Sequence, residues 1–459
     1  MIDVNKMYKS QKLHLKCQNS MRVKCRFKLL LIVNRIIILQ MRRLLTSIFI
    51  LCAFFTSAKS LNNRLFHFTK TGEDPFTPYL NSIPTVLQVI STVNSGSGDE
   101  AIVTKEIVFS SKNGVNKIYG IMAFPQRAGK FPGVLVIHAG DGNAQNAKGI
   151  IERLARKGYA AFACDMAGFC NTNTTPYSSG PWKATPAPDE RPRFYLKNGP
   201  KSSSLVDAEV AGIEAFNLLR SQPNVDAEKM GITGYSWGSY STTMLSGLLG
   251  DKVKAAYAFW GAGFFDKGTY WKKIIEDLPD SIRTTWLTYF DAGRRAPHIK
   301  ANFFMEAAVN DTYFWVESVN ATLQAIPKAK NHVWGPNVNH REAPTSALMQ
   351  GLFFDYNLKG LGSPFGHVAI SDVKSMKDST KEVTIKLDIP SGVAIKTVQV
   401  YYSEPQARWD ARKWMPLTAT EKNKKTYTAT IPVDLVKKNV NFYAHLTDTR
   451  GAVTSSDIY

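Results

Sequence analysis

Cysteine is scarce in this chain. The 459 residues include five, and all but Cys164 and Cys170 lie within the first 52 positions. The Cys and His residues are nowhere spaced as the ligands of a zinc site are, so we expect no metal and no cofactor. Five residues separate Cys164 from Cys170, which is compatible with a local disulfide in an oxidising compartment and also with two free thiols. The disulfide is the interpretation that we favour.

Acidic residues are also few, 37 against 57 Lys and Arg, and the formal net charge is +20. Residues 1–58 contain eleven of the basic residues and one acid, Asp3, so they account for +10 and the rest of the chain carries the other +10. The basic residues of that remainder are dispersed, and no basic stretch alternates with aromatics as a single-strand binder requires. We therefore expect a solvated basic surface and no nucleic-acid partner.

Long apolar runs are lacking as well. The longest near the N-terminus, from Leu44 to Phe55, is shorter than the roughly 20 residues that span a bilayer. It follows a basic start at Met41 and precedes small residues at Thr56 and Ala58, the pattern of a secretory signal peptide. We predict a start at Met41, cleavage near Ala58, a secreted or extracytoplasmic protein, and no stable membrane insertion after signal removal.

Two kinds of periodicity divide the remaining chain. Between about residues 130 and 358, runs that are apolar throughout, such as Val134 to Ile137 and Ala255 to Trp260, alternate with helical stretches, which predicts a parallel sheet covered by helices. An alternating hairpin at 102–124 precedes them. Beyond Gly360 the pattern changes to strict period two, which is typical of an immunoglobulin-like or fibronectin-like β-sandwich.

The sequence Gly-Tyr-Ser-Trp-Gly around Ser236 carries the chemistry. A predicted strand ends at Gly234 and a predicted helix begins after Gly238, the strand-turn-helix of a nucleophile elbow in the α/β-hydrolase fold. Glycines are required there because the serine backbone is strained and its neighbours pack closely. The backbone N–H of Trp237 and one from the loop after the first parallel strand, for which we choose Ala139, are the expected oxyanion hole.

A serine hydroxyl needs a base, and the base needs an acid that follows the nucleophile in the chain. Asp311 comes directly after an expected buried strand, 303–309, and is favoured over Asp291, which lies in a polar insertion. His340 lies in a loop before the last helix, whereas His332 begins an expected strand. A base must reach over the strand ends from a loop, so we expect His340 to be the base.

The segments VDAEKMGITGYSWGSY, VNDTYFW and VNH, together with the trailing β-module, resemble the dienelactone hydrolase and acetyl xylan esterase branch of the α/β-hydrolases, and less closely the prolyl oligopeptidase family. The resemblance covers residues 100–358 and implies a carboxylesterase with Ser236, Asp311 and His340 as its triad. Dienelactone hydrolases proper use Cys as nucleophile, so Ser236 disfavours dienelactone as substrate. We expect a small-molecule or carbohydrate ester instead.

The predicted domains are a leader at 1–58, an N-terminal extension at 59–100, an α/β-hydrolase domain at 101–360 and the sandwich at 366–459. Two other functions stay open. A peptidase of the prolyl oligopeptidase type is one, although that family usually carries a large β-domain before the hydrolase. A non-catalytic adhesion protein on a hydrolase scaffold is the other, although such proteins have lost triad residues.

Overall fold

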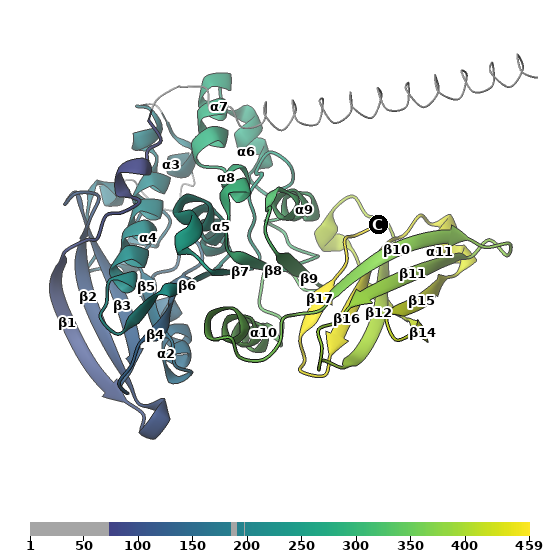
Figure 1. Ribbon diagram of the computed structural model, residues 1–459. Helices are drawn as coiled ribbons and strands as arrows, with labels where there is room; N and C mark the ends of the chain where they lie inside the picture. Colours follow the sequence, from purple (N-terminus) through teal and green to yellow (C-terminus); the bar gives the residue numbers. More distant parts are fainter. Residues whose placement is uncertain (1–72, 185–190, 197) are drawn as a thin grey trace, which may run out of the picture. The chain divides into compact units, whose positions relative to one another are not determined.

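The structure, a computed structural model, describes residues 73–184, 191–196 and 198–459. Its main element is a nine-stranded sheet with the order β1-β2-β3-β5-β4-β6-β7-β8-β9 (Figure 1). The first three strands and the β3–β5 pair are antiparallel, and β5, β4, β6, β7, β8 and β9 are parallel. The strands are β1 Val86–Ser95, β2 Ile102–Ser111, β3 Asn116–Pro125, β4 Phe131–Ile137, β5 Ala160–Cys164, β6 Val225–Tyr235, β7 Ala255–Phe259, β8 Asn302–Ala308 and β9 Lys330–Gly335.

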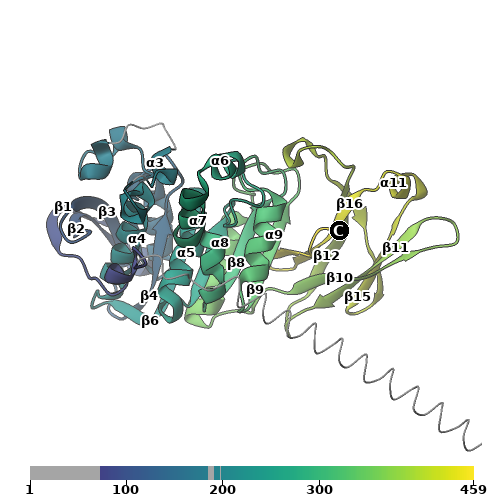
Figure 2. The same cartoon turned by 90° about the horizontal axis from the view of Figure 1, so that it is seen from above.

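Helices cover both faces of this sheet. The strands β4, β5 and β7 are buried at every position, as a sheet sandwiched between helices requires. One face packs against α2 and α10, and the other against α4, α5, α8 and α9 (Figure 1). Figure 2 looks onto the face that carries α4, α5, α8 and α9. The helices are α2 Lys148–Arg156, α3 Arg191–Phe194, α4 Ser204–Arg220, α5 Trp237–Leu249, α6 Lys272–Asp277, α7 Asp280–Tyr289, α8 Ala292–Arg295, α9 Val316–Ala325 and α10 Ser346–Phe354, with a π-helical turn at Asp355–Lys359.

The C-terminal region forms two antiparallel four-stranded sheets, ordered β10-β11-β15-β14 and β13-β12-β16-β17. Alternate residues of the central strands close a separate apolar core between the sheets, as the period-two pattern predicted. The elements are β10 His367–Ser375, β11 Lys381–Asp388, β12 Ile395–Ser403, β13 Met415–Thr418, β14 Thr420–Asn423, β15 Thr426–Ile431, α11 Val433–Lys437, β16 Asn441–Asp448 and β17 Val453–Ser455. The α/β-hydrolase fold and the β-sandwich are both confirmed.

The structure differs from the sequence analysis at the start of the hydrolase sheet. The strand β1 pairs with β2 along its whole length, so the sheet begins at Val86, inside the segment predicted as an extension. Helix α4 is capped by Ser203, whose side chain accepts from the Leu205 N–H at 3.2 Å.

The expected disulfide is wrong: Cys164 and Cys170 are both free and buried. Cys164 lies in β5, with its thiol 3.9 Å from the Ala211 carbonyl oxygen of α4. Both cysteines belong to the apolar core of the hydrolase, where they act as small hydrophobic residues.

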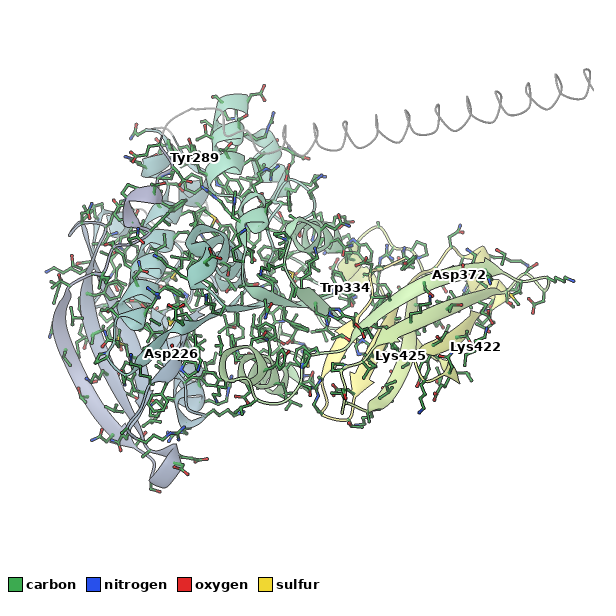
Figure 3. The ribbon with its side chains drawn as sticks, viewed as in Figure 1. Asp226, Tyr289, Trp334, Asp372, Lys422 and Lys425 are labelled. Atoms are coloured by element: carbon green, nitrogen blue, oxygen red, sulfur yellow. The ribbon has the colours of Figure 1, made fainter. Side chains whose placement is uncertain are left out.

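The sandwich makes direct contacts with the α/β domain and with the linker before it, residues 361–365. Trp334 lies in β9, next to the sandwich (Figure 3). Its N–H donates to Ser455 Oγ at 3.0 Å, and its carbonyl accepts from the Tyr443 hydroxyl at 3.4 Å. The Arg450 guanidinium also donates to the Pro364 carbonyl of the linker at 2.9 Å.

The predicted leader lies outside the described residues. Within the described residues, none of the helices is long and apolar enough to cross a membrane.

Candidate active site

Ser236 sits at a sharp turn between β6 and α5. Its backbone has φ 57° and ψ −117°, a conformation that is costly for a residue with a side chain and that is retained where the surroundings impose it. The glycines on either side are required by close contacts. A Cβ on Gly234 would lie 2.2 Å from the Gly238 carbonyl oxygen, and one on Gly238 would lie 2.4 Å from the Ile137 carbonyl oxygen. The turn therefore has the geometry of a nucleophile elbow.

The structure brings the three predicted triad residues together. His340 Nε2 lies 2.7 Å from Ser236 Oγ, and His340 Nδ1 lies 2.9 Å and 3.0 Å from the two carboxylate oxygens of Asp311. Asp311 follows β8 and is buried. Its Oδ1 also accepts from the backbone N–H groups of Tyr313 and Phe314 at 2.7 Å and 3.0 Å, which fix the carboxylate toward the imidazole. These distances are those that nucleophile, base and acid need for proton transfer.

The two rival residues have other partners. Asp291 is fully buried and accepts from the backbone N–H groups of Phe264, Phe265 and Gly293. It caps α8, so its carboxylate has a structural role within the insertion. His332 lies in β9, as expected, with its Nε2 3.3 Å from the Ser456 carbonyl oxygen of the sandwich. Burial lowers the pKa of His332, so this ring is a neutral structural group at the domain contact.

The predicted oxyanion residues lie on adjoining segments. Trp237 is the first residue of α5, so its N–H has no acceptor within the helix. The loop of Ala139 follows β4, and a Cβ on the next residue, Gly140, would lie 2.6 Å from the Trp237 ring. This loop is therefore packed directly on the start of α5, which is the arrangement that a two-amide oxyanion hole needs. The roles of Trp237 and Ala139 remain predictions.

His138 holds the loop of Ala139 in place. Its Nε2 accepts from the Met166 N–H at 3.0 Å, so the proton is on Nδ1, which lies 2.6 Å from the Ala139 carbonyl oxygen. Burial lowers the pKa of His138 to about 4, which keeps the ring neutral and this tautomer stable near neutral pH. The ring thus joins the end of β4 to the segment after β5.

Aromatic side chains surround the serine and histidine, and most of them are core residues. Five aromatics of the 264–298 insertion are buried: Phe265, Trp271, Trp286, Tyr289 and Phe290. Tyr313 and Tyr270 are exceptions, with exposed fractions of 39% and 58%. The Tyr313 ring lies 4.8 Å from the His340 ring and 5.5 Å from the Tyr270 ring. These two tyrosines form an accessible aromatic surface beside His340. The sequence offered no signal that separated them from their buried neighbours.

Other features lie away from the triad. A cavity of about 280 Å³ is lined by residues of β8, α10 and the linker, including Phe304, Phe353 and Phe365. None of these residues touches Ser236 or His340. Within the described residues, no group of three or more His, Cys, Asp or Glu side chains is arranged to hold a metal ion.

Comparison with known proteins agrees with this fold. Residues 118–334 match the Dienelactone hydrolase family model. A putative carboxymethylenebutenolidase from Synechocystis sp. is 29% identical over 178 residues, which are 38% of this chain and 66% of that protein, so the match spans just under two thirds of the relative.

Two solved structures have a similar fold. An acetyl xylan esterase from Paenibacillus sp. R4 superimposes with a TM-score of 0.51 at 19% identity, covering 63% of this chain and 96% of the other. Acetyl xylan esterase 1 from Thermoanaerobacterium sp. JW/SL YS485 gives 0.51 at 17% identity, covering 62% and 95%. At these identities the likeness concerns the fold alone. The chain thus has the α/β-hydrolase fold with a β-sandwich at its C-terminus, and its residues 118–334 are similar to the Dienelactone hydrolase family.

Proposed function

We propose that this chain is a secreted serine carboxylesterase that hydrolyses short-chain acyl esters, acetyl esters above all, through an acyl-enzyme on Ser236. The observation that carries the proposal is the continuous hydrogen-bonded path from Ser236 Oγ through His340 to Asp311, with distances of 2.7 Å and 2.9 Å. Ser236 lies on a strained turn whose neighbours are glycines, which is the setting in which a serine hydroxyl acts as a nucleophile.

The reaction follows from this arrangement. Ser236 Oγ attacks the ester carbonyl carbon while His340 Nε2 takes the hydroxyl proton, and Asp311 stabilises the imidazolium. The backbone N–H groups of Trp237 and Ala139 donate to the carbonyl oxygen as it becomes negative. The alcohol leaves with the proton from His340, and the acyl group stays on Ser236. Water then attacks the acyl carbon and loses a proton to His340. His340 passes this proton to Ser236 Oγ as the bond to the acyl carbon breaks and the carboxylic acid leaves.

The substrate follows from the side chains around the serine. Trp260 is buried, with its ring 5.7 Å from the His340 ring, and Tyr313 lies on the same histidine. Bulky rings this close to the base favour a compact acyl group. The exposed faces of Tyr270 and Tyr313 suit a ring-shaped alcohol such as a sugar, because aromatic faces bury the apolar face of a ring.

Labelling with a fluorophosphonate probe tests the mechanism. We expect the wild type to be labelled and Ser236→Ala to remain unlabelled, with turnover of p-nitrophenyl acetate lower by several orders of magnitude. The melting temperature should hardly change, because one hydroxyl contributes little packing. Near-wild-type activity in the variant would remove Ser236 from the mechanism.

Substrate class is tested by comparing p-nitrophenyl acetate, acetylated xylan and a Gly-Pro chromogenic amide under the same conditions. We expect kcat/KM to be higher for both esters than for the amide. A higher value for the amide would identify a peptidase instead and overturn the esterase assignment.

A further inference from the structure

The segment between β12 and β13 of the sandwich reaches the loops that carry the acid and the base. Asn310 directly precedes Asp311 in the chain, and its side chain is buried. Its Nδ2 donates to the Arg412 carbonyl at 2.7 Å and to the Trp409 carbonyl at 3.1 Å. Both acceptors are backbone atoms of the sandwich, so the residue beside the acid is held by the other domain.

A second asparagine makes a similar contact from the loop of the base. Asn337, three residues before His340, has φ +57°, a conformation that Asn tolerates better than most residues. Its Oδ1 accepts from the Trp414 N–H at 2.8 Å and its Nδ2 donates to the Trp414 carbonyl at 2.8 Å. Trp414 is fully buried, with its ring 5.0 Å from that of Tyr443, so the anchor itself is rigidly packed.

The two loops are also bonded to each other. The Asn310 N–H donates to the Val338 carbonyl at 3.2 Å, and the Thr312 N–H donates to Asn339 Oδ1 at 3.1 Å. The loops of Asp311 and His340 and the 409–414 segment therefore form one hydrogen-bonded unit. A displacement of about 1 Å in such a unit is enough to lower a catalytic rate by about two orders of magnitude.

We propose that the 409–414 segment of the β-sandwich is a positioning element of the triad, which holds Asp311 and His340 in register through Asn310 and Asn337. The proposal rests on the proposed function, because it assigns the two asparagines to the same reaction. Neither asparagine touches Ser236. The buried Nδ2 of Asn310 and both amide atoms of Asn337 bond to backbone groups of the other domain, and such directional contacts fix a geometry that apolar packing alone leaves free.

Two variants test this in the full chain. Asn337→Gly removes the amide and keeps the positive φ, while Asn310→Ala removes the other link. The matched control is Asn331→Ala, because Asn331 Nδ2 also donates to a carbonyl across the domain junction, that of Gly366 at 2.9 Å, but lies at the opposite end of β9. We expect kcat for p-nitrophenyl acetate to fall at least about tenfold in both test variants, with KM changed less than about twofold. The control should stay near wild type.

Two further readouts separate positioning from simple loss of stability. The acidic limb of the kcat/KM profile against pH should move in both test variants and stay in place in the control, because that limb reports the base. The low-field proton resonance of His340 Nδ1–H, assigned by its loss in His340→Gln, should shift or broaden in both variants. This resonance needs no substrate, so it tests positioning even if the wild type proves inactive toward esters, a result that would contradict only the proposed function.

An unchanged resonance and an unchanged pH profile in folded Asn337→Gly and Asn310→Ala would overturn the proposal, whatever their melting temperatures. A loss of kcat in Asn331→Ala equal to that in the test variants would also overturn it, because any weakening of the domain contact would then have the same effect. If one test variant does not fold, the other decides the question alone, since each removes an independent link.

Discussion

Glu209 gives a sharp prediction about how stability depends on pH. It lies on α4 with no exposed surface, and its Oε1 accepts from Ser241 Oγ at 2.5 Å. Within the described residues, its Oε2 has no hydrogen-bond partner. Burial raises the pKa of this carboxyl from 4.5 to about 8, so the folded protein keeps it protonated at neutral pH while the unfolded chain does not.

The sign follows from proton linkage. Between about pH 4.5 and pH 8 the folded state binds one proton more than the unfolded state, so the free energy of unfolding decreases as pH rises through this window. Each pH unit within this window lowers the free energy of unfolding by about 1.4 kcal/mol. From about pH 5 to about pH 8.5, Glu209 should therefore lower the free energy of unfolding by about 4 kcal/mol.

Glu209→Gln should remove this fall in the free energy of unfolding with pH, because glutamine is neutral at every pH in the window. Its amide also keeps an acceptor oxygen for Ser241. Urea unfolding of variant and wild type at about pH 5 and about pH 8.5 gives the measurement. We expect similar stability at the lower pH and a variant that is several kcal/mol more stable at the higher pH.

An exposed carboxyl controls for the change in net charge. Glu276→Gln, at a side chain that is 52% exposed, should show no comparable gain at high pH. The reasoning about Glu209 is refuted if the difference between Glu209→Gln and wild type does not grow with pH. A difference of equal size at both pH values would point to altered packing instead of titration.

The remaining predictions concern the site and the leader. His340→Ala should be nearly as inactive as Ser236→Ala, whereas His332→Ala should lower the melting temperature more than kcat, because its ring contacts Ser456 and Trp334 and not the triad. Kinetics on both variants check this, and an inactive His332→Ala would contradict it. Tyr270→Ala should reduce kcat/KM for a sugar acetate by about fivefold and leave ethyl acetate unchanged, since only the ring-bearing alcohol stacks; an equal loss on both esters would count against stacking. N-terminal sequencing of secreted material should find a start near Lys59, and a start at Met1 would exclude cleavage.

The sequence was most informative where the chemistry restricts the residue type. The glycines around Ser236, the aspartate after a buried strand and the histidine in a loop are local patterns, and the fold brings the strand ends to one edge of the sheet, where these residues meet. The short runs that are apolar throughout likewise predicted β4, β5 and β7, because burial on both faces leaves no polar positions.

What could not be predicted depends on partners distant in the chain. The strand β1 has mixed polarity, with Val86, Leu87, Val89 and Val93 exposed, so only its pairing with β2 makes it a strand. The spacing of Cys164 and Cys170 gave no information on where their thiols point. Asn310 and Asn337 were assigned no role, because their partners are backbone atoms of a domain some 75 to 100 residues further along.

The buried amide of Asn310 also restricts how this protein can be produced. Asn310, Asp311 and Thr312 form an N-glycosylation sequon, yet the residue is only 6% exposed and its side-chain nitrogen, the atom that would carry the sugar, faces the Arg412 carbonyl. A glycan attached there during synthesis would have no room once the sandwich packs against β9. A host that modifies this sequon would therefore yield chains whose two domains cannot close on each other, and a host without N-glycosylation is the suitable source.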